Sequence, residues 1–407
     1  MLLVILALRE RGWTLTIWWP ARWDCDNVPS TQKLDNMLEL LVENRMCPLL
    51  AIVLVCTSSA LMAQTPPGDL TEMSLEQILG LRIVRSQDSP DVDAPRGKWS
   101  LSQRYIRVNF EGNRDGTTEL SDEDVLWSGP PATRTDKNFP IVPHTIHQEA
   151  FVTRIGYEIN DRWNWNLLIP YIVQETDHVA NTALAPIPAN FAEFIIRSEG
   201  LGDISLSPSY LVWEKGLHTV HLHSGVSLPV GRINVKDDTP APGEDNQLPY
   251  TMQLGSGTLD YLPGITYAGQ EGIVGWGGQV LATIRIGKNG RGYSLGDRVS
   301  ISSWVKVRPL RWLEPSFNVT AQIWDRIDGV DKDFANPPGG FFPATVADPS
   351  KYGGEKVNVN FGVSLIGSGR FERHALDIAG GIPIYQRLNG PQPQERWRFN
   401  VSWNLDF

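Results

Sequence analysis

The stretch Trp397-Arg398-Phe399-Asn400-Val401-Ser402-Trp403-Asn404-Leu405-Asp406-Phe407 decides the fold. Apolar residues occupy every odd position, and polar residues occupy every even position. Because successive side chains of a β-strand point to opposite faces, this segment has one apolar face and one polar face. A strand of a membrane barrel needs both, since its outer face meets lipid and its inner face meets water. The segment therefore predicts a transmembrane barrel strand.

The same stretch resembles the C-terminal strand of bacterial outer-membrane proteins, which ends in Phe. In those proteins this strand is read by the barrel-assembly machinery. The resemblance implies that the strand ending at Phe407 is recognised in the same way.

Further strand-like segments occur upstream, and together they predict an all-β protein. The expected strands are 98–110, 147–159, 162–174, 201–213, 217–230, 258–269, 273–287, 297–308, 311–324, 355–367, 373–386 and 395–407. A tilted membrane strand needs about 9–11 residues, whereas soluble strands average about five or six. These segments are therefore too long for a soluble sandwich and suit a barrel of about 12 strands.

The connections between these segments alternate in length. Short, turn-like joints such as Asn160-Asp161 and Gln270-Glu271-Gly272 alternate with long joints such as 231–257 and 325–354. Outer-membrane barrels have short periplasmic turns and longer outside loops. The alternation predicts an up-and-down antiparallel barrel with an even strand count and both termini in the periplasm.

Two segments show how clear the alternation is, and where it fails. Residues 163–173 place Trp163 and Tyr171 on one apolar face, opposite Asn164. In the first segment, Tyr105 is out of phase with the apolar residues that begin at Ile106, which indicates a bulge or a different register.

Composition excludes several classes of protein. Charged residues make up 20% of the chain, and the formal net charge is −10, which argues against a nucleic-acid-binding protein. All three cysteines, Cys25, Cys47 and Cys56, lie near the N-terminus, so no disulfide framework or thiol nucleophile is expected beyond them. No motif for a cofactor or a metal stands out.

The N-terminal part divides into three segments. Residues 46–63 have an apolar core of signal-peptide length followed by small residues, which predicts export. Residues 1–45 do not fit an export signal, so we interpret them as an upstream mis-start. Residues 64–97 are expected to be periplasmic with a short helix, because Ser74 and Gln77 form a capping box. This helix resembles an element that precedes the plug of TonB-dependent receptors; packing at the barrel mouth is favoured over TonB engagement.

The expected registers give candidate lumen residues, and the loops give candidate contacts for a solute. The lumen candidates are Arg154, Glu158, Asp260, Arg285, Lys306, Asp377 and Arg398. They either line a polar path or pair with one another and fill the bore. Apolar loops 183–196 and 336–349 contribute Phe191, Phe194, Phe341 and Phe342. These residues indicate an inward-folded cap or a first site for apolar solutes; the rival interpretations are a dimer contact and simple loop packing.

An enzymatic reading rests on His218, His221 and His223, which cluster in one expected strand. Three imidazoles bind a metal if a carboxylate joins them. No Gly-x-Ser-x-Gly elbow or other nucleophile arrangement accompanies them. We therefore expect neither catalysis nor a metal site, and a barrel lipid hydrolase is the least favoured reading.

Two short motifs carry a resemblance to a family. Gly200-Leu201-Gly202-Asp203 and, one strand later, Pro229-Val230-Gly231 are similar to the signatures of the outer-membrane family named for the MetA pathway of phenol degradation. Glycines let the chain turn from loop into strand, and Asp203 can cap that turn. The resemblance covers residues 98–407 and implies a transporter-like barrel.

Together the sequence predicts a barrel in the cell outer membrane of Gram-negative type, exported through its signal peptide and surrounded by lipid. It predicts passive uptake of small hydrophobic or aromatic compounds. The alternative is a structural or adhesin-like barrel without transport.

Overall fold

The computed structural model describes residues 5–9, 12–16, 99–182, 192–241, 245–335 and 340–407. The chain forms two units, residues 1–63 and residues 64–407. In the first unit, β1 (Ile5–Arg9) pairs with β2 (Gly12–Thr16) as an antiparallel hairpin. The expected signal peptide and the helix within 64–97 lie outside the described residues and stay predictions. Over the described ranges, no helix is both long enough and apolar enough to span a membrane.

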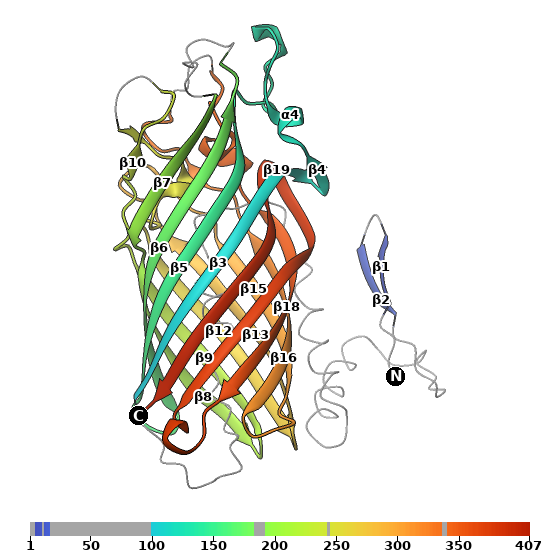
Figure 1. Cartoon of the computed structure of the whole chain (residues 1–407), viewed down its shortest axis with the longest axis vertical. Coiled ribbons are helices and arrows are strands. Elements are labelled where there is room, and N and C mark those ends of the chain that lie inside the picture. The colour runs from blue at the N-terminus through green and yellow to red at the C-terminus, as the bar shows by residue number, and fades with distance from the viewer. Residues whose placement is uncertain (1–4, 10–11, 17–98, 183–191, 242–244, 336–339) are drawn as a thin grey trace, which may run out of the picture. The chain divides into compact units, whose positions relative to one another are not determined.

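The second unit is built around a closed antiparallel sheet (Figure 1). Its strands are β3 (Trp99–Gly116), β5 (Ile141–Glu158), β6 (Trp163–Ala180), β8 (Ile204–Lys215), β9 (His218–Leu228), β12 (Leu259–Glu271), β13 (Val274–Ile286), β15 (Arg298–Val307), β16 (Leu313–Trp324), β18 (Gly354–Ile366) and β19 (His374–Asp406). Each strand pairs with the next in this order, and β19 pairs with β3 to close the ring. Each of the eleven ring strands therefore has a pairing neighbour on both sides. The expected antiparallel barrel is confirmed.

The expected count of about 12 strands differs from the named elements, because two expected strands lie within β19. This element has 33 residues. Residues 375–388 pair with β18, and residues 388–406 pair with β3. Counted as named strands, eleven elements close the ring.

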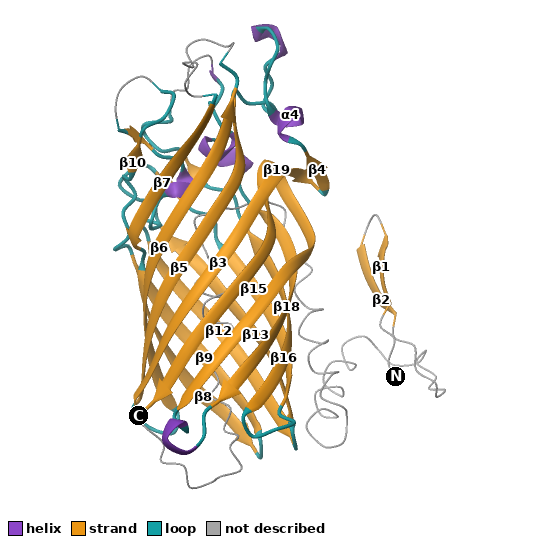
Figure 2. Ribbon diagram, viewed as in Figure 1, coloured by secondary structure: helices purple, strands orange, loops and turns teal. Residues whose placement is uncertain are grey.

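The connections alternate in length, as the sequence indicates. Short joints link β5 to β6, β8 to β9, β12 to β13, β15 to β16 and β18 to β19, the last with η7 (Gly369–Phe371). Figure 2 shows loops and small helices gathered at the opposite end. That end carries β4 (Thr118–Leu120), α4 (Asp122–Val125), η1 (Pro131–Thr133), β7 (Glu193–Leu201), β10 (Lys236–Asp237), β11 (Asn246–Gln247), η3 (Tyr250–Met252), β14 (Tyr293–Ser294), β17 (Asp328–Gly329), η5 (Thr345–Ala347) and η6 (Pro349–Lys351).

Alternation along β6 and β19 separates an outward face from an inward face. Trp163 and Tyr171 in β6 are exposed, whereas Asn166 is buried inside. In β19, Trp397 and Trp403 are exposed outward, whereas Ser402 and Asn404 are buried on the opposite face. The two-faced reading of the last residues is confirmed.

The first barrel strand corrects the sequence analysis. Tyr105 pairs with Phe151 on the outer face, and Ile106 pairs with Ala150 on the inner face. The β3–β5 register runs unbroken from Trp99 to Glu111, so there is no bulge in this ladder. The apolar residues from Ile106 onward are out of phase because they line the inside of the barrel.

Several strands extend beyond their expected ends. Residues 111–116, 141–146 and 175–180 were expected in loops but belong to β3, β5 and β6. Their outward positions include Glu175 and Asp177, so the apolar side of the alternation stops before the strands do.

The outer part of the wall beside β6 is formed by β7, which sequence reasoning placed in a loop. β7 pairs with residues 171–179 of β6, and β8 pairs with residues 163–168. The chain changes direction between them, where Gly200 has a φ of 146°. A side chain at Gly202 would come within 2.7 Å of Ile172 Cδ1, so glycine lets the chain approach β6 closely here.

Candidate functional site

Three segments between ring strands pack together over one end of the barrel, and we call their described residues the cap: 229–241 with 245–258, 287–297, and 325–335 with 340–353. Each contributes one buried tyrosine. The ring of Tyr250 meets Tyr293 and Tyr352 edge-on, with ring centres 4.8 and 5.6 Å apart. Such edge-to-face pairs add about 0.5–1.5 kcal/mol to the burial of the rings. Aromatic packing therefore joins the three cap segments.

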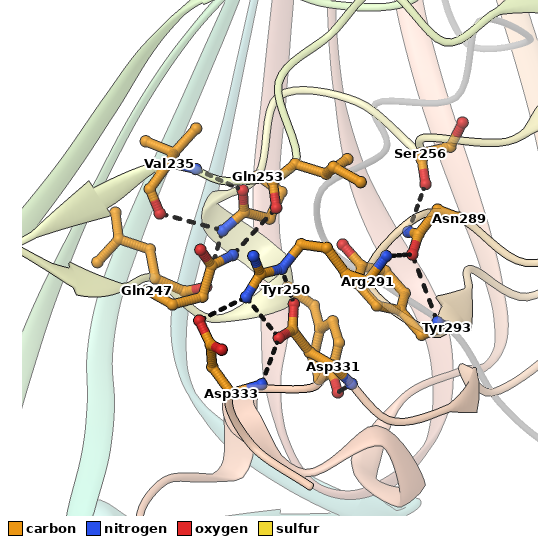
Figure 3. A network of polar contacts seen from close by, with 12 residues as sticks. Val235, Gln247, Tyr250, Gln253, Ser256, Asn289, Arg291, Tyr293, Asp331 and Asp333 are labelled. Carbon is orange, nitrogen blue, oxygen red and sulfur yellow. Dashed lines mark hydrogen bonds and ion pairs between the residues drawn. The ribbon is translucent and has the colours of Figure 1, made fainter.

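A buried ion pair also joins two cap segments (Figure 3). Arg291 Nη2 donates to Asp331 Oδ1 at 2.7 Å and to Asp333 Oδ2 at 2.6 Å. The backbone N–H of Asp331 donates to the Tyr250 hydroxyl at 2.9 Å. The hydrogen bonds that Arg291 donates to Asp331 raise the pKa of Arg291 above its ordinary value. All three cap segments thus meet around one guanidinium.

The first cap segment reaches the inner wall of the barrel through Gln253. Its side-chain amide donates to Leu248 O at 2.8 Å and its carbonyl accepts from Val235 N at 3.0 Å. Gln174 Nε2 in β6 donates to Gln253 O at 3.2 Å, and Gln148 Nε2 in β5 donates to Gln174 Oε1 at 2.7 Å. A ladder of glutamines therefore fixes the cap against the inward face of β5 and β6.

The two motifs that resemble family signatures, residues 200–203 and 229–231, meet where the first cap segment joins the barrel strands. Asp203 Oδ1 accepts from Gly231 N at 2.9 Å, and Oδ2 accepts from Ser256 N at 2.8 Å and Ser256 Oγ at 2.7 Å. A side chain on Gly231 would lie 2.5 Å from Leu254 O. Asp203 therefore ties both ends of the first cap segment to the β7–β8 break; Pro229 and Gly200 flank this junction in sequence.

Inside the barrel, buried apolar residues pack into one cluster that we call the apolar wall. It consists of Ile106, Val108, Phe110, Ile146, Ala150, Val152 and Leu168 from β3, β5 and β6, with Leu281 from β13. Strands β8, β9 and β12 lie between β6 and β13 in the ring. Leu281 therefore reaches this cluster from another side of the bore.

Beside the apolar wall, the inward face carries a charged group that we call the Glu395 triad. Lys356 Nζ lies 2.6 Å from Glu395 Oε2, and Arg398 donates to both carboxylate oxygens at 2.6 Å. Asn358 Nδ2 also donates to Glu395 Oε1 at 3.0 Å. The carboxylate is fully enclosed, with a side-chain exposure of 1%.

All seven predicted lumen residues fall on the inward face of the alternation, and several have partners there. Arg154 donates to Asn166 at 2.9 Å, Arg285 pairs with Asp260, and Lys306 lies 3.6 Å from Glu314. Asp377 accepts from Ser402 and Asn404 at 3.1 and 2.7 Å. Glu158 ends β5 opposite Asn164, and Arg398 belongs to the Glu395 triad. Their part in solute passage stays a prediction.

The predicted loop phenylalanines have separate surroundings. Phe194 lies in β7, not in a loop, and stacks on His178 with ring centres 4.8 Å apart. Phe341 is exposed and lies 4.9 Å from the Arg134 guanidinium, which also donates to Phe342 O at 2.8 Å. Phe191 lies outside the described residues.

The three histidines do not form one site. His221 and His223 face inward, and His223 Nε2 lies 2.8 Å from the Thr266 hydroxyl. His218 faces outward beside Tyr267 and Trp276. Over the described ranges, no group of three or more His, Cys, Asp or Glu could hold a metal.

Sequence reasoning missed Glu395, Lys356, Gln253 and Arg291. Several residues that they contact lie 37 to 79 residues away in the sequence. A local sequence pattern therefore could not predict these contacts. The apolar wall did leave a signal, since the out-of-phase residues from Ile106 belong to it.

Comparisons with known proteins give likenesses in fold. No protein-family model matches this chain, and no curated protein matches its sequence. Among solved structures, it is similar to the COG4313 outer membrane channel from Pseudomonas putida F1, with 11% identity, a TM-score of 0.48, and coverage of 79% of this chain and 99% of that one. It is also similar to the TodX monoaromatic hydrocarbon channel, with 8% identity, a TM-score of 0.38, and coverage of 77% and 91%. A third is the transport unit of the autotransporter AIDA-I from Escherichia coli, with 7% identity, a TM-score of 0.41, and coverage of 83% and 99%. At such values each likeness describes shape and says nothing of a solute.

Proposed function

We propose that this chain is an outer-membrane β-barrel channel for passive uptake of small hydrophobic or aromatic compounds. The proposal rests on three features of the described residues: an apolar outer surface, a closed ring of strands, and an apolar wall inside that ring.

The outer surface suits lipid. Its exposed residues on successive strands include Trp99, Phe151, Trp163, Trp165, Tyr171, Leu222, Ile265, Ile284, Val299, Ile323, Phe361, Trp397, Phe399 and Trp403. A soluble protein rarely exposes so continuous an apolar surface. Beyond the row of Tyr105, Phe151 and Tyr171, charged pairs appear at outward positions of β3, β5, β6 and β7, with Arg107 paired to Glu149 and Arg197 paired to Glu175. We place the outer membrane boundary at this row.

The finer topology belongs to the same proposal. Counting the two arms of β19 as separate membrane strands gives twelve, which is the even number that places both ends of a barrel on one side. Short turns face the periplasm in such barrels, so we place Phe407 there and the cap outside. The strand ending at Phe407 is then available to the barrel-assembly machinery, and the MetA-pathway family resemblance fits this reading.

The apolar wall is the observation that favours hydrophobic solutes. A lumen that carries only water and ions needs no cluster of eight buried apolar side chains. Burial of apolar solute area against such a surface is worth about 25 cal/mol per Å². Phe341, exposed at the outer end, remains our candidate for first contact.

The test measures entry of the neutral aromatic probe N-phenylnaphthylamine into cells that have a lipopolysaccharide outer membrane and lack their own hydrophobic-solute channels. Expression of the chain should speed entry above the empty-vector rate. Leu281→Asp places a charge in the apolar wall and should return the rate to that of the vector. Ser316→Asp, on the inward face of β16, adds the same carboxylate elsewhere and should leave entry unchanged.

Other results would decide against the channel. Equal entry with and without the wild-type chain would favour the alternative, a structural or adhesin-like barrel. Equal entry with wild type and Leu281→Asp would remove the apolar wall from the proposed route.

A further inference from the structure

The Glu395 triad has more positive than negative charge. Two cations, Lys356 and Arg398, share the single carboxylate of Glu395. Arg298 lies nearby, and its guanidinium is 5.7 Å from the Trp324 ring centre, while the Lys356 ammonium is 5.5 Å from the same ring. Arg298 and Arg398 both lie close enough to repel the charge on Lys356.

Lys356 and Arg398 keep a little exposed surface inside the barrel, whereas the carboxylate of Glu395 is enclosed. Side-chain exposure is 13% for Lys356 and 11% for Arg398, against 1% for Glu395. A solute that reaches this point therefore meets the cations first.

The triad also adjoins the apolar wall. In the ladder between β19 and β3, Arg398 pairs with Val108, and Glu395 pairs with Phe110. Paired residues on one face of a sheet have Cβ atoms about 4.5–5.5 Å apart. One step across the ladder thus leads from a cationic surface to an apolar one.

We propose that this junction binds small amphipathic carboxylates, with the acid group on Lys356 and Arg398 and the aromatic or alkyl body on the apolar wall. The inference rests on the proposed channel and narrows its solutes to organic acids. A second carboxylate offsets the excess positive charge, and charge-assisted hydrogen bonds to Arg and Lys in such a partly dry site are among the stronger ones.

The role of Glu395 follows from the same charges. It already occupies both cations, so it competes with an incoming acid for their donors. Removing its charge while keeping its shape should strengthen binding of an acid. A purely structural ion pair predicts the opposite, because loss of the carboxylate would only loosen the site.

The experiment compares two probes with the same body, 4-phenylbutyrate and the neutral 4-phenylbutanamide. Binding is measured by calorimetry at pH 7.5 with the full chain in lipid nanodiscs, and empty nanodiscs give the background. Wild type should bind the carboxylate about tenfold more tightly than the amide, as expected for one hydrogen bond to a charged group. Lys356→Gln should remove this preference, and Glu395→Gln should increase it.

Controls separate binding from folding. Lys356→Arg keeps a cation and should keep the preference, and Lys137→Gln, in an exposed ion pair with Asp115 outside the barrel, should not change it. Each variant must also fold, which is checked by its faster migration on a sodium dodecyl sulfate gel when unboiled than when boiled, as expected for the wild type. Equal binding of the two probes by wild type, or weaker carboxylate binding by Glu395→Gln, would overturn the inference while leaving the channel intact. If wild type binds neither probe and N-phenylnaphthylamine entry also equals the vector rate, both proposals fail together.

Discussion

Asp203 holds both ends of the first cap segment, although these ends lie far from it in the sequence. Its carboxylate accepts three hydrogen bonds from Gly231 and Ser256. Asp203→Asn leaves one acceptor oxygen and turns an amide group toward N–H donors. We expect the free energy of unfolding to fall by about 1–3 kcal/mol. Guanidinium unfolding in detergent, followed by tryptophan fluorescence, measures the change; Asp161→Asn in an exposed turn is the control, and an equal midpoint for both would contradict the prediction.

His178 makes the stability of the barrel depend on pH. It lies near the outer end of β6, beyond the proposed membrane boundary, and burial lowers its pKa to about 4. An unfolded histidine titrates near 6.5, so the unfolded chain takes up the proton first. Its stabilising contribution is therefore complete above pH 6.5 and is lost as the pH falls toward 4, by about 3 kcal/mol in total.

Replacing His178 by Gln should remove this part of the pH dependence. Unfolding midpoints of wild type and His178→Gln are compared at pH 7.5 and pH 4.5. The wild type should lose more stability between the two values than the variant does, since carboxylate titrations are common to both. Parallel losses would show that His178 takes up no extra proton on unfolding.

For single residues, the alternation of apolar and polar positions predicted which face of the sheet a side chain occupies. It did not predict which other residues that side chain contacts. The inward position of Asp260 follows from counting residues along a strand. Its ion pair with Arg285 depends on how two strands are registered, which no single segment encodes. Asp203 was read as the cap of a local turn, whereas Gly231 and Ser256 lie 28 and 53 residues further on.

Among the elements, the cap segments depend on the Arg291 ion pair. Arg291→Gln leaves Asp331, whose side chain is 1% exposed, buried without its cation. Breaking such a pair costs about 3–5 kcal/mol. We expect the cap to open locally while the ring of strands persists. Limited proteolysis should then cut within residues 325–353, and the heat-dependent gel shift should remain.

The double variant provides the control for this prediction. Arg291→Gln with Asp331→Asn removes both charges and should restore much of the protease resistance, because no uncompensated charge remains buried. If the single and double variants are cut at the same rate, the ion pair does not hold the cap closed.

Element boundaries were predicted best where outward apolar residues mark them. The bounds of β13 and β15 differ from the expected segments by one residue at each end, and their outward positions are mostly apolar, with Ser303 in β15 as an exception. β7 was missed because its outward face alternates Ile195 with Arg197 and Glu199. Outside the proposed membrane, a strand does not need an apolar outer face. The sequence pattern that reveals membrane strands is therefore absent from β7.

For the whole molecule, closure of the ring should make the fold resistant to detergent. The refolded chain should run faster on a gel when unboiled than when boiled, because closed barrels stay compact in sodium dodecyl sulfate. Removing residues 397–407 deletes most of the arm that pairs with β3. The truncated chain should show no shift, with the full chain under the same conditions as the control. A persisting shift would mean that the ring closes without this arm.

Pairing between β19 and β3 also has a consequence for biosynthesis. The ring joins the first and the last strands of the second unit, so it cannot close before the residues of β19 that pair with β3 have been synthesised. Every shorter nascent product has two bare strand edges, and such edges pair readily with other chains. We therefore expect that a product lacking the arm of β19 that pairs with β3 forms an aggregation-prone sheet in place of a slightly weaker barrel.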